Sequence, residues 1–224
     1  MPDLAKLWDD ESTHPGDLLE YLEGDLETGR IERKWRLFLC GCARHAIRAA
    51  GVGWAEEMVS VSERFADDAI DFNTLDAARQ AFRPLLPGLG SRPTPGDYAL
   101  WAVSGTAYEP GYAHKFDAAL SNLDCAADAT TDEDAEYREQ VRLLKDIFGN
   151  PFRPVAFGPA WRSDTAVSLA RQMYETRDFS LMPILADALQ DAGCEHPDVL
   201  AHCRDPDGTH VRGCWVVDLV LGKQ

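Results

Sequence analysis

The sequence contains no long apolar run, and this absence argues against a membrane-spanning helix. No stretch of the 224 residues approaches the ~18 consecutive apolar residues that a helix needs to cross a bilayer. The first twelve residues, MPDLAKLWDDES, lack the basic start and apolar segment of a signal peptide. We therefore expect a cytoplasmic protein that does not enter a membrane. Its six cysteines are then expected to be reduced thiols or metal ligands rather than disulfides.

The sequence also lacks the short motifs that identify common catalytic sites. It has neither G-x-x-x-x-G-K-[ST] nor G-x-G-x-x-G, so a nucleotide site has no support. The motifs G-x-S-x-G and H-E-x-x-H are missing too, and no C-x-x-C pair is present. No run alternates between apolar and polar residues as a half-exposed strand does. These absences give no catalytic signature and leave little evidence for a sheet.

Positive charge is scarce relative to negative charge. The chain has 22 Lys and Arg residues against 38 Asp and Glu residues, a formal net charge of -16 at pH 7. Direct binding to nucleic acid is not expected, because a general nucleic-acid binder needs a basic face that displaces counterions from phosphates. Docking on an anionic membrane is disfavoured for the same reason. An acidic surface favours solubility, and it also suits a basic protein partner or mimicry of nucleic acid.

Apolar residues recur at spacings of three and four along most of the chain, which predicts an all-α multi-helix bundle. The pattern is clearest over 31–50, where Trp35, Phe38 and Cys42 share one face. Further helices are predicted at 54–71, 74–83, 98–108, 112–129, 131–148, 164–176, 181–192 and 197–202. The segment CWVVDLVL at 214–221 fits a buried strand or a short helix, and its helical surroundings favour the helix.

Proline and glycine clusters suggest how the chain is divided. The best linker candidate contains four prolines and three glycines in the sequence PLLPGLGSRPTPG, residues 84–96. The predicted segments are an acidic, largely solvated N-terminal segment (1–30), an N-terminal helical bundle (31–83), this linker (84–96), a middle helical part (97–145) and a C-terminal helical module with a Cys/His cluster (146–224).

Several short stretches near the two ends of the chain are distinctive. They are RLFLCGCAR (36–44), VSERFAD (61–67), DIFGNPFRP (146–154), ILADAL (184–189) and HVRGCWVVDL (210–219). Together they resemble an uncharacterised paralogous family of planctomycete-type bacterial proteins. The resemblance implies that the C-terminal part, about 80 residues, is a recurring module. It implies no activity, because that family has none to carry over.

Half of the cysteines and half of the histidines lie between residues 194 and 214, with the spacing C-x-H-x5-H-C-x6-H-x3-C. Zinc takes four nitrogen or sulfur ligands in a tetrahedron, usually as two close pairs. The candidate ligands are Cys194, His202, His210 and Cys214, and His196 is an alternative member of the first pair. The alternative is ordinary core packing, because the spacing matches no standard zinc finger. A zinc ion here is expected to be structural, since no acid–base partner lies nearby in the sequence.

A basic stripe lies within the acidic chain. Arg33, Arg36, Arg44 and Arg48 fall near one side of the helix predicted over 31–50, off its apolar face. A concentrated arginine face can bind phosphate or carboxylate groups. The favoured interpretation is pairing with acids within the chain or on a partner protein. The acidic blocks at 1–29 and 117–139 are the candidate partners within the chain.

An enzyme hypothesis rests on Cys40, His45 and the same arginines. Arg36 and Arg44 lie one turn from Cys40 on either side, and their charges would lower the pKa of its thiol. Cys42 lies on the apolar face and is expected to be a packed thiol.

The leading hypothesis from sequence is a non-catalytic interaction or regulatory protein of the adaptor type, which acts through its acidic surface on another protein. The alternatives are a structural zinc-binding scaffold module, an enzyme with the Cys40/His45/arginine site, and an acidic nucleic-acid mimic.

Overall fold

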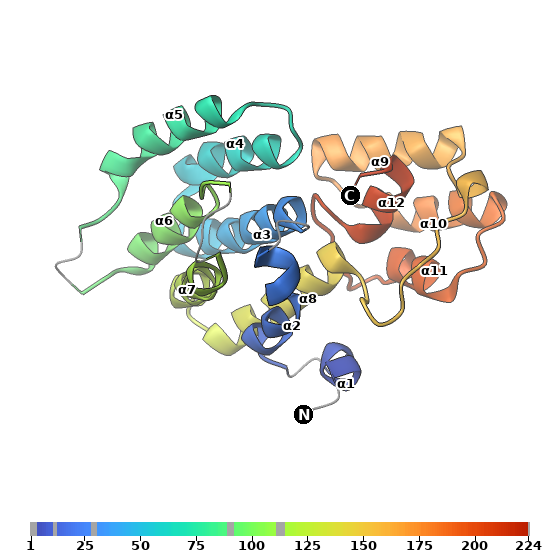
Figure 1. Cartoon of the computed structure of the whole chain (residues 1–224), viewed down its shortest axis with the longest axis horizontal. Coiled ribbons are helices and arrows are strands. Elements are labelled where there is room, and N and C mark those ends of the chain that lie inside the picture. Colours follow the sequence, from blue (N-terminus) through green and yellow to red (C-terminus); the bar gives the residue numbers. More distant parts are fainter. Residues whose placement is uncertain (1–3, 11–12, 28–30, 89–91, 111–114, 224) are drawn as a thin grey trace. The chain divides into compact units, whose positions relative to one another are not determined.

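The computed structural model describes the chain except for residues 1–3, 11–12, 28–30, 89–91, 111–114 and 224. The described residues form twelve α-helices and three short 3-10 helices, and none of them lies in a strand (Figure 1). The predicted all-α fold is therefore confirmed. Within the described residues, no helix combines the length and the apolar character that crossing a membrane would need.

The chain divides into two compact units, residues 1–141 and residues 142–224. The boundary falls inside helix α8 (Glu133–Phe148), four residues before the predicted start of the C-terminal module. Residues 97–141, predicted as part of a separate middle region, belong to the same unit as the N-terminal helices. The predicted linker at 84–96 is accordingly a connection within the first unit.

Helix α3 (Glu32–Ala50) is the centre of the first unit. It packs against α4 (Glu56–Ala66), α6 (Pro95–Gly105) and α7 (Lys115–Asp128). Because other helices lie on several sides of α3, every residue from 35 to 43 is buried, and burial is not limited to one face of the helix. A helix surrounded in this way is expected to be apolar on more than one face. The stretch WRLFLCGCA fits this expectation, because its only charged residue is an arginine.

The N-terminal segment contributes to the core of the first unit. Helices α1 (Leu4–Asp9) and α2 (Pro15–Glu27) contact each other, and α2 also packs on α7. Their buried apolar residues are Trp8, Leu18, Leu19 and Leu22. These four apolar side chains face inward, whereas acids such as Asp17 and Glu20 are exposed, so the acidic segment has one buried face and a solvated remainder. Helix α5 (Phe72–Phe82) packs on α4 and runs along the edge of this unit (Figure 1).

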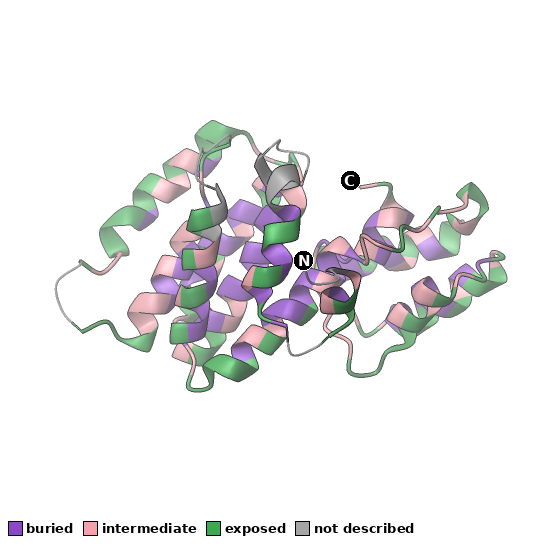
Figure 2. Ribbon diagram, turned by 60° about the horizontal axis from the view of Figure 1, so that its bottom comes forward, coloured by how far each residue is buried: buried purple, intermediate pink, exposed green. Residues whose placement is uncertain are grey.

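The second unit surrounds its own apolar core. It contains the last two turns of α8 and the helices α9 (Asp164–Thr176), α10 (Met182–Asp191), α11 (Pro197–Arg204) and α12 (Trp215–Leu221). Helix α9 packs on α10 and α12, and α10 packs on α11. The helical alternative for residues 214–221 is confirmed. In each unit the buried residues gather where helices face one another, and exposed residues cover the outer sides (Figure 2).

Candidate metal centre

Four side chains of metal-binding types meet in the second unit: Asp146, His202, His210 and Cys214. One ligand atom from each lies within 4.8 Å of the other three. Asp146 is in the last turn of α8, and His202 is in α11. His210 lies in the connection between α11 and α12, and Cys214 is the N-cap residue of α12. Within the described part of the chain no second group of this kind occurs.

The oxygen Oδ1 of Asp146 is the centre of the group. It lies 3.0 Å from Nδ1 of His210 and 3.2 Å from Nε2 of His202. The sulfur of Cys214 is 3.2 Å from the same Nε2 atom. Zinc bonds of about 2.0–2.3 Å in a tetrahedron place neighbouring ligand atoms about 3.3–3.7 Å apart, so these three separations need to change by only about 0.5 Å.

The second carboxylate oxygen of Asp146 fixes the orientation of the group. The backbone N–H of Val211 donates a hydrogen bond to Oδ2 over 2.9 Å, which leaves Oδ1 facing the two imidazoles. Carboxylates that bind metals are commonly held by such an additional hydrogen bond. The Asp146 side chain is only 1% exposed. Burial alone would raise its pKa, but hydrogen bonds and charges from His202 and His210 outweigh burial and hold the pKa below its ordinary value.

Cys214 completes the group with a soft ligand. Burial raises the pKa of its thiol well above the ordinary value, and the nearby Asp146 carboxylate raises that pKa further. The isolated thiol therefore holds its proton. A bound zinc ion has the opposite effect, because its charge deprotonates a coordinating thiol. A divalent cation that binds here would therefore displace the proton of the Cys214 thiol.

Packing holds the two imidazole rings in place. The rings of His202 and His210 meet edge to face with centroids 4.8 Å apart, and His202 also contacts the Trp215 ring at 5.2 Å. A Cβ atom on Gly208 would approach Nε2 of His210 to 3.0 Å, so any larger residue there would push the ring by a few tenths of an ångström. This Nε2 atom is buried and has no hydrogen-bond partner among the described residues.

Cys194 does not belong to the group. It lies fully buried in the core of the second unit, as does Cys203. Burial raises the pKa of the Cys203 thiol to about 12, and Cys194 contributes to that increase. The sequence interpretation thus included three of the four members of this group and missed Asp146. One local signal pointed to it, because an acid between Leu144 and Ile147 interrupts the buried face of its helix.

The arginines of α3 make contacts inside the first unit. Arg36 is buried and donates hydrogen bonds to the carbonyl oxygens of Thr106 (2.6 Å) and Tyr108 (3.1 Å). Its guanidinium also stacks over the Tyr108 ring at 3.9 Å. The expectation that Arg36 lies off the apolar face is wrong, because α3 is surrounded by other helices and its arginine face is covered.

The acids that pair with the other arginines come from an unexpected part of the chain. Arg44 forms ion pairs with Glu56, at 3.0 Å, and with Glu63, both in α4. Arg33 pairs at 3.1 Å with Asp67, which directly follows α4. The blocks at 1–29 and 117–139 do not supply these partners. Arg48 is exposed. A phosphate group would therefore have to compete with carboxylates for Arg33 and Arg44.

The proposed cysteine nucleophile is inaccessible. Cys40 is fully buried, and its sulfur lies 3.9 Å from the carbonyl oxygen of Val59. His45 faces α8 instead, with its two ring nitrogens 3.6 Å from Glu136 and 3.9 Å from Glu139. A thiol without exposed surface has no access to a substrate, so the structure gives the enzyme hypothesis no support. Cys42 is buried as predicted.

Comparisons of the chain with protein-family models, curated proteins and solved structures found no match. The resemblance to the planctomycete-type family therefore stays a prediction. Function has to be argued from the geometry of the molecule.

Proposed function

We propose that residues 142–224 form a zinc-binding module, in which Asp146, His202, His210 and Cys214 hold one structural zinc ion. The observation that carries this proposal is that one ligand atom from each of these four side chains lies within 4.8 Å of the others, with both imidazoles against Oδ1 of Asp146 and the Cys214 sulfur against His202. A set of one oxygen, two nitrogens and one sulfur suits zinc, whereas calcium and magnesium take oxygen ligands. Four protein ligands fill a tetrahedral site and leave no position for a substrate, which favours a structural role.

Metal content of the purified full-length protein tests this proposal. We expect about one zinc per chain after loading and desalting, and loss of that zinc in Asp146→Asn and Cys214→Ala. Two variants serve as matched controls in the same unit. Cys203→Ala removes a buried thiol outside the group, and Asp187→Asn removes an exposed acid. Both are expected to keep zinc.

Two results would contradict the zinc site. One is a wild-type protein that retains less than ~0.2 equivalents of zinc. The other is equal zinc retention in the ligand variants and in the controls. Substitution by cobalt adds an independent measurement, because a tetrahedral site with a thiolate ligand gives cobalt d–d and sulfur-to-metal absorption that Cys214→Ala should remove.

We also propose that the first unit binds a basic protein partner, which keeps the adaptor hypothesis. The charge of the chain is unevenly divided. Residues 1–141 have 13 basic and 27 acidic residues, a net charge of -14, whereas residues 142–224 have 9 and 11, a net charge of -2. The excess negative charge is thus concentrated in one compact unit, where it raises the association rate of a positively charged partner.

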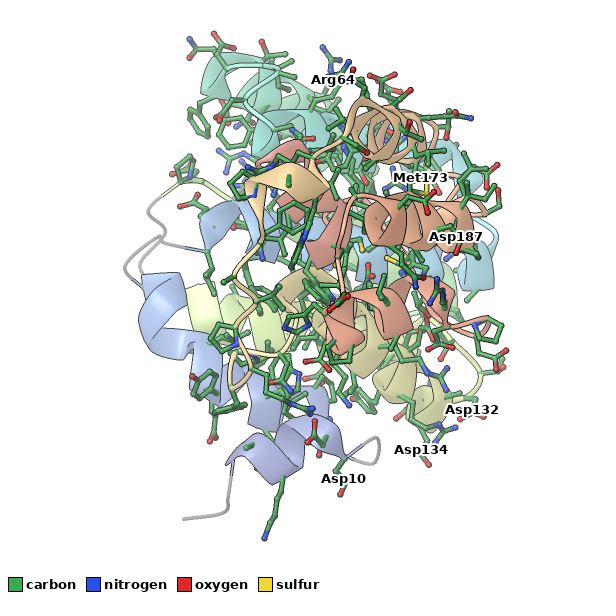
Figure 3. The ribbon with its side chains drawn as sticks, turned by 90° about the vertical axis from the view of Figure 1, so that its right-hand side faces the viewer. Asp10, Arg64, Asp132, Asp134, Met173 and Asp187 are labelled. Atoms are coloured by element: carbon green, nitrogen blue, oxygen red, sulfur yellow. The ribbon has the colours of Figure 1, made fainter. Side chains whose placement is uncertain are left out.

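Exposed acids are dense on four neighbouring elements of this unit. Helix α1 contacts α2, α2 packs on α7, and side chains link α7 to α8. Asp132 and Asp134 extend outward at the start of α8, and Asp10 does so after α1 (Figure 3). We call these exposed acids the acidic region: Asp9, Asp10, Asp17, Glu20, Asp117, Asp124, Asp128, Asp132, Glu133 and Asp134.

A charge-neutralised variant tests the acidic region. Asparagine at positions 124, 128, 132 and 134 removes four charges, and asparagine still caps α8 at position 132. The matched control carries asparagine at the exposed aspartates 187, 191, 205 and 207 of the second unit. We expect proteins captured from native extract to be retained by the wild type and the control, and lost from the variant and at high salt. Equal capture by the variant would contradict the proposal.

A further inference from the structure

We infer that zinc occupancy controls the order of residues 204–214, the last residue of α11 and its connection to α12, which we call the clasp segment. This inference rests on the proposed zinc site. It concerns what the metal does for the second unit, and it is separable from whether the metal binds.

Asp146 of α8 holds the clasp segment with both of its carboxylate oxygens. Oδ1 faces His210, and Oδ2 accepts a hydrogen bond from the N–H of Val211. The segment also has contacts that need no metal: Arg204 donates to Asp187 and Gln190 of α10, and the Arg212 guanidinium lies over the Tyr174 ring of α9. Whatever holds Asp146 in the ligand group therefore also holds this segment against α8.

The helices on either side of the clasp segment are short and have different supports. Helix α11 has 8 residues and packs on α10, whereas α12 has 7 residues and packs on α9. Helices of fewer than ~12 residues are marginal by themselves and depend on tertiary contacts. One ion bound by Asp146, His202 and Cys214 would tie the end of α8, helix α11 and the start of α12 to a common point.

Thermodynamic linkage between zinc binding and opening of the clasp segment gives the size of the expected change in exchange rate. Any opening of the clasp segment that separates its ligands has to release the zinc ion. Free zinc at 100 times its Kd therefore lowers the equilibrium constant for that opening about 100-fold. Without the ion, the ligand group keeps the hydrogen bonds of Asp146 and the contact between His202 and Cys214, but no bond joins all four side chains at one point. We therefore expect the metal-free second unit to keep a folded core and to have a clasp segment that opens more often than in the zinc-bound unit.

Amide hydrogen exchange of the full-length chain, with zinc and after chelation, tests this inference. Zinc at 100 times its Kd should slow exchange in peptides covering 204–214 about 100-fold. Helix α4 (Glu56–Ala66) of the first unit is the internal control, and its exchange should not change. Fluorescence of Trp215 gives a second readout, because its ring lies 5.2 Å from the His202 ring and against Gly149.

Cys214→Ser separates metal binding from intrinsic helix stability. Serine is among the preferred N-cap residues, so the variant should keep or improve α12 while it removes the thiolate. We expect this variant to lose the zinc-dependent slowing of exchange, and Cys203→Ala to keep it.

The possible failures are distinguishable. Stoichiometric zinc with unchanged exchange in 204–214 overturns the inference and leaves the zinc site standing. Failure to bind zinc overturns the zinc site and the inference together. Slowing that persists in Cys214→Ser also overturns the inference, because the order of the segment would then not depend on the complete ligand group.

Discussion

Arg36→Met removes a buried guanidinium that joins α3 to the end of α6. Arg36 donates to two backbone carbonyls and stacks on Tyr108. Hydrogen bonds to charged groups contribute about 1.5–3 kcal/mol each, and a desolvated cation–π contact contributes up to about 2 kcal/mol. Desolvation of the guanidinium offsets part of this gain, and removing one partner of a buried charged network costs about 3–5 kcal/mol. We expect the free energy of unfolding of the first unit to fall by that amount.

Urea denaturation and differential scanning calorimetry measure this loss. For a unit of this size, about 3–5 kcal/mol corresponds to a fall in Tm of roughly 10–15 °C. The transition of the first unit is recognised because a chelator should not move it. Arg36→Lys keeps the charge and loses the paired donors, so it should lie between the wild type and Arg36→Met.

Arg48→Met is the matched control on the same helix, because Arg48 is exposed and its replacement should change stability by less than about 0.5 kcal/mol. Equal stability of Arg36→Met and Arg48→Met would refute the argument that Arg36 is a structural residue. It would also reopen the interpretation of the arginines as an anion-binding face.

Three further predictions concern Cys125, Tyr137 and Gly208. Cys125 is the one cysteine of the six that is not buried, and burial with Asp128 and Asp124 raises its pKa to about 11. Alkylation of the native protein at pH 8 should therefore modify Cys125 alone and slowly, and equal labelling of Cys40 would contradict its burial. Burial, followed by the charge of Asp124, raises the pKa of Tyr137 to about 12. The fold thus favours the protonated phenol, so this contribution to stability is complete below pH 10 and is lost as the pH rises towards 12. Burial raises the pKa of Tyr108 further still, so spectrophotometric titration should show two late tyrosines, of which Asp124→Asn shifts the earlier one downward. Absence of that shift would count against the assignment. Gly208→Ala should weaken zinc binding about 10–100-fold without loss of helical circular dichroism, because its Cβ would displace the His210 ring. Gly53→Ala, where a Cβ meets nothing within 4 Å, should leave zinc affinity unchanged, and equal affinity in both variants would show that the ring does not need this space.

Helix periodicity could be read from the sequence because it is a local property. The helix predicted at 31–50 is found at 32–50, the one at 164–176 has the same bounds, and the one at 181–192 is found at 182–191. The division into units was harder to predict. Proline and glycine mark where a helix stops, and they marked 84–96, but α5 before this connection packs on α4 and α6 after it packs on α3, within the same unit. The true boundary lies inside a continuous helix, where no residue type signals it.

Three members of the candidate metal group were predictable because they are neighbours in the sequence, and the fourth was not because it depends on tertiary structure. His202, His210 and Cys214 lie within one short stretch, whereas Asp146 reaches them from another helix. Cys194 matched the expected residue type and spacing, but it packs into the apolar core. Spacing thus identified the part of the chain that holds the site, and only the packing of α8 identified the oxygen at its centre.

The presence of Asp146 in this place is itself an argument for a cation. A buried carboxylate is costly unless positive charge and hydrogen bonds compensate for it. Val211 satisfies one oxygen, and the other faces two imidazoles and a thiol. Imidazoles and a thiol alone compensate that charge only if an imidazole is protonated. A zinc ion bound by one carboxylate, one thiolate and two neutral imidazoles gives a neutral group, so the same four side chains become inexpensive to bury once the ion is present.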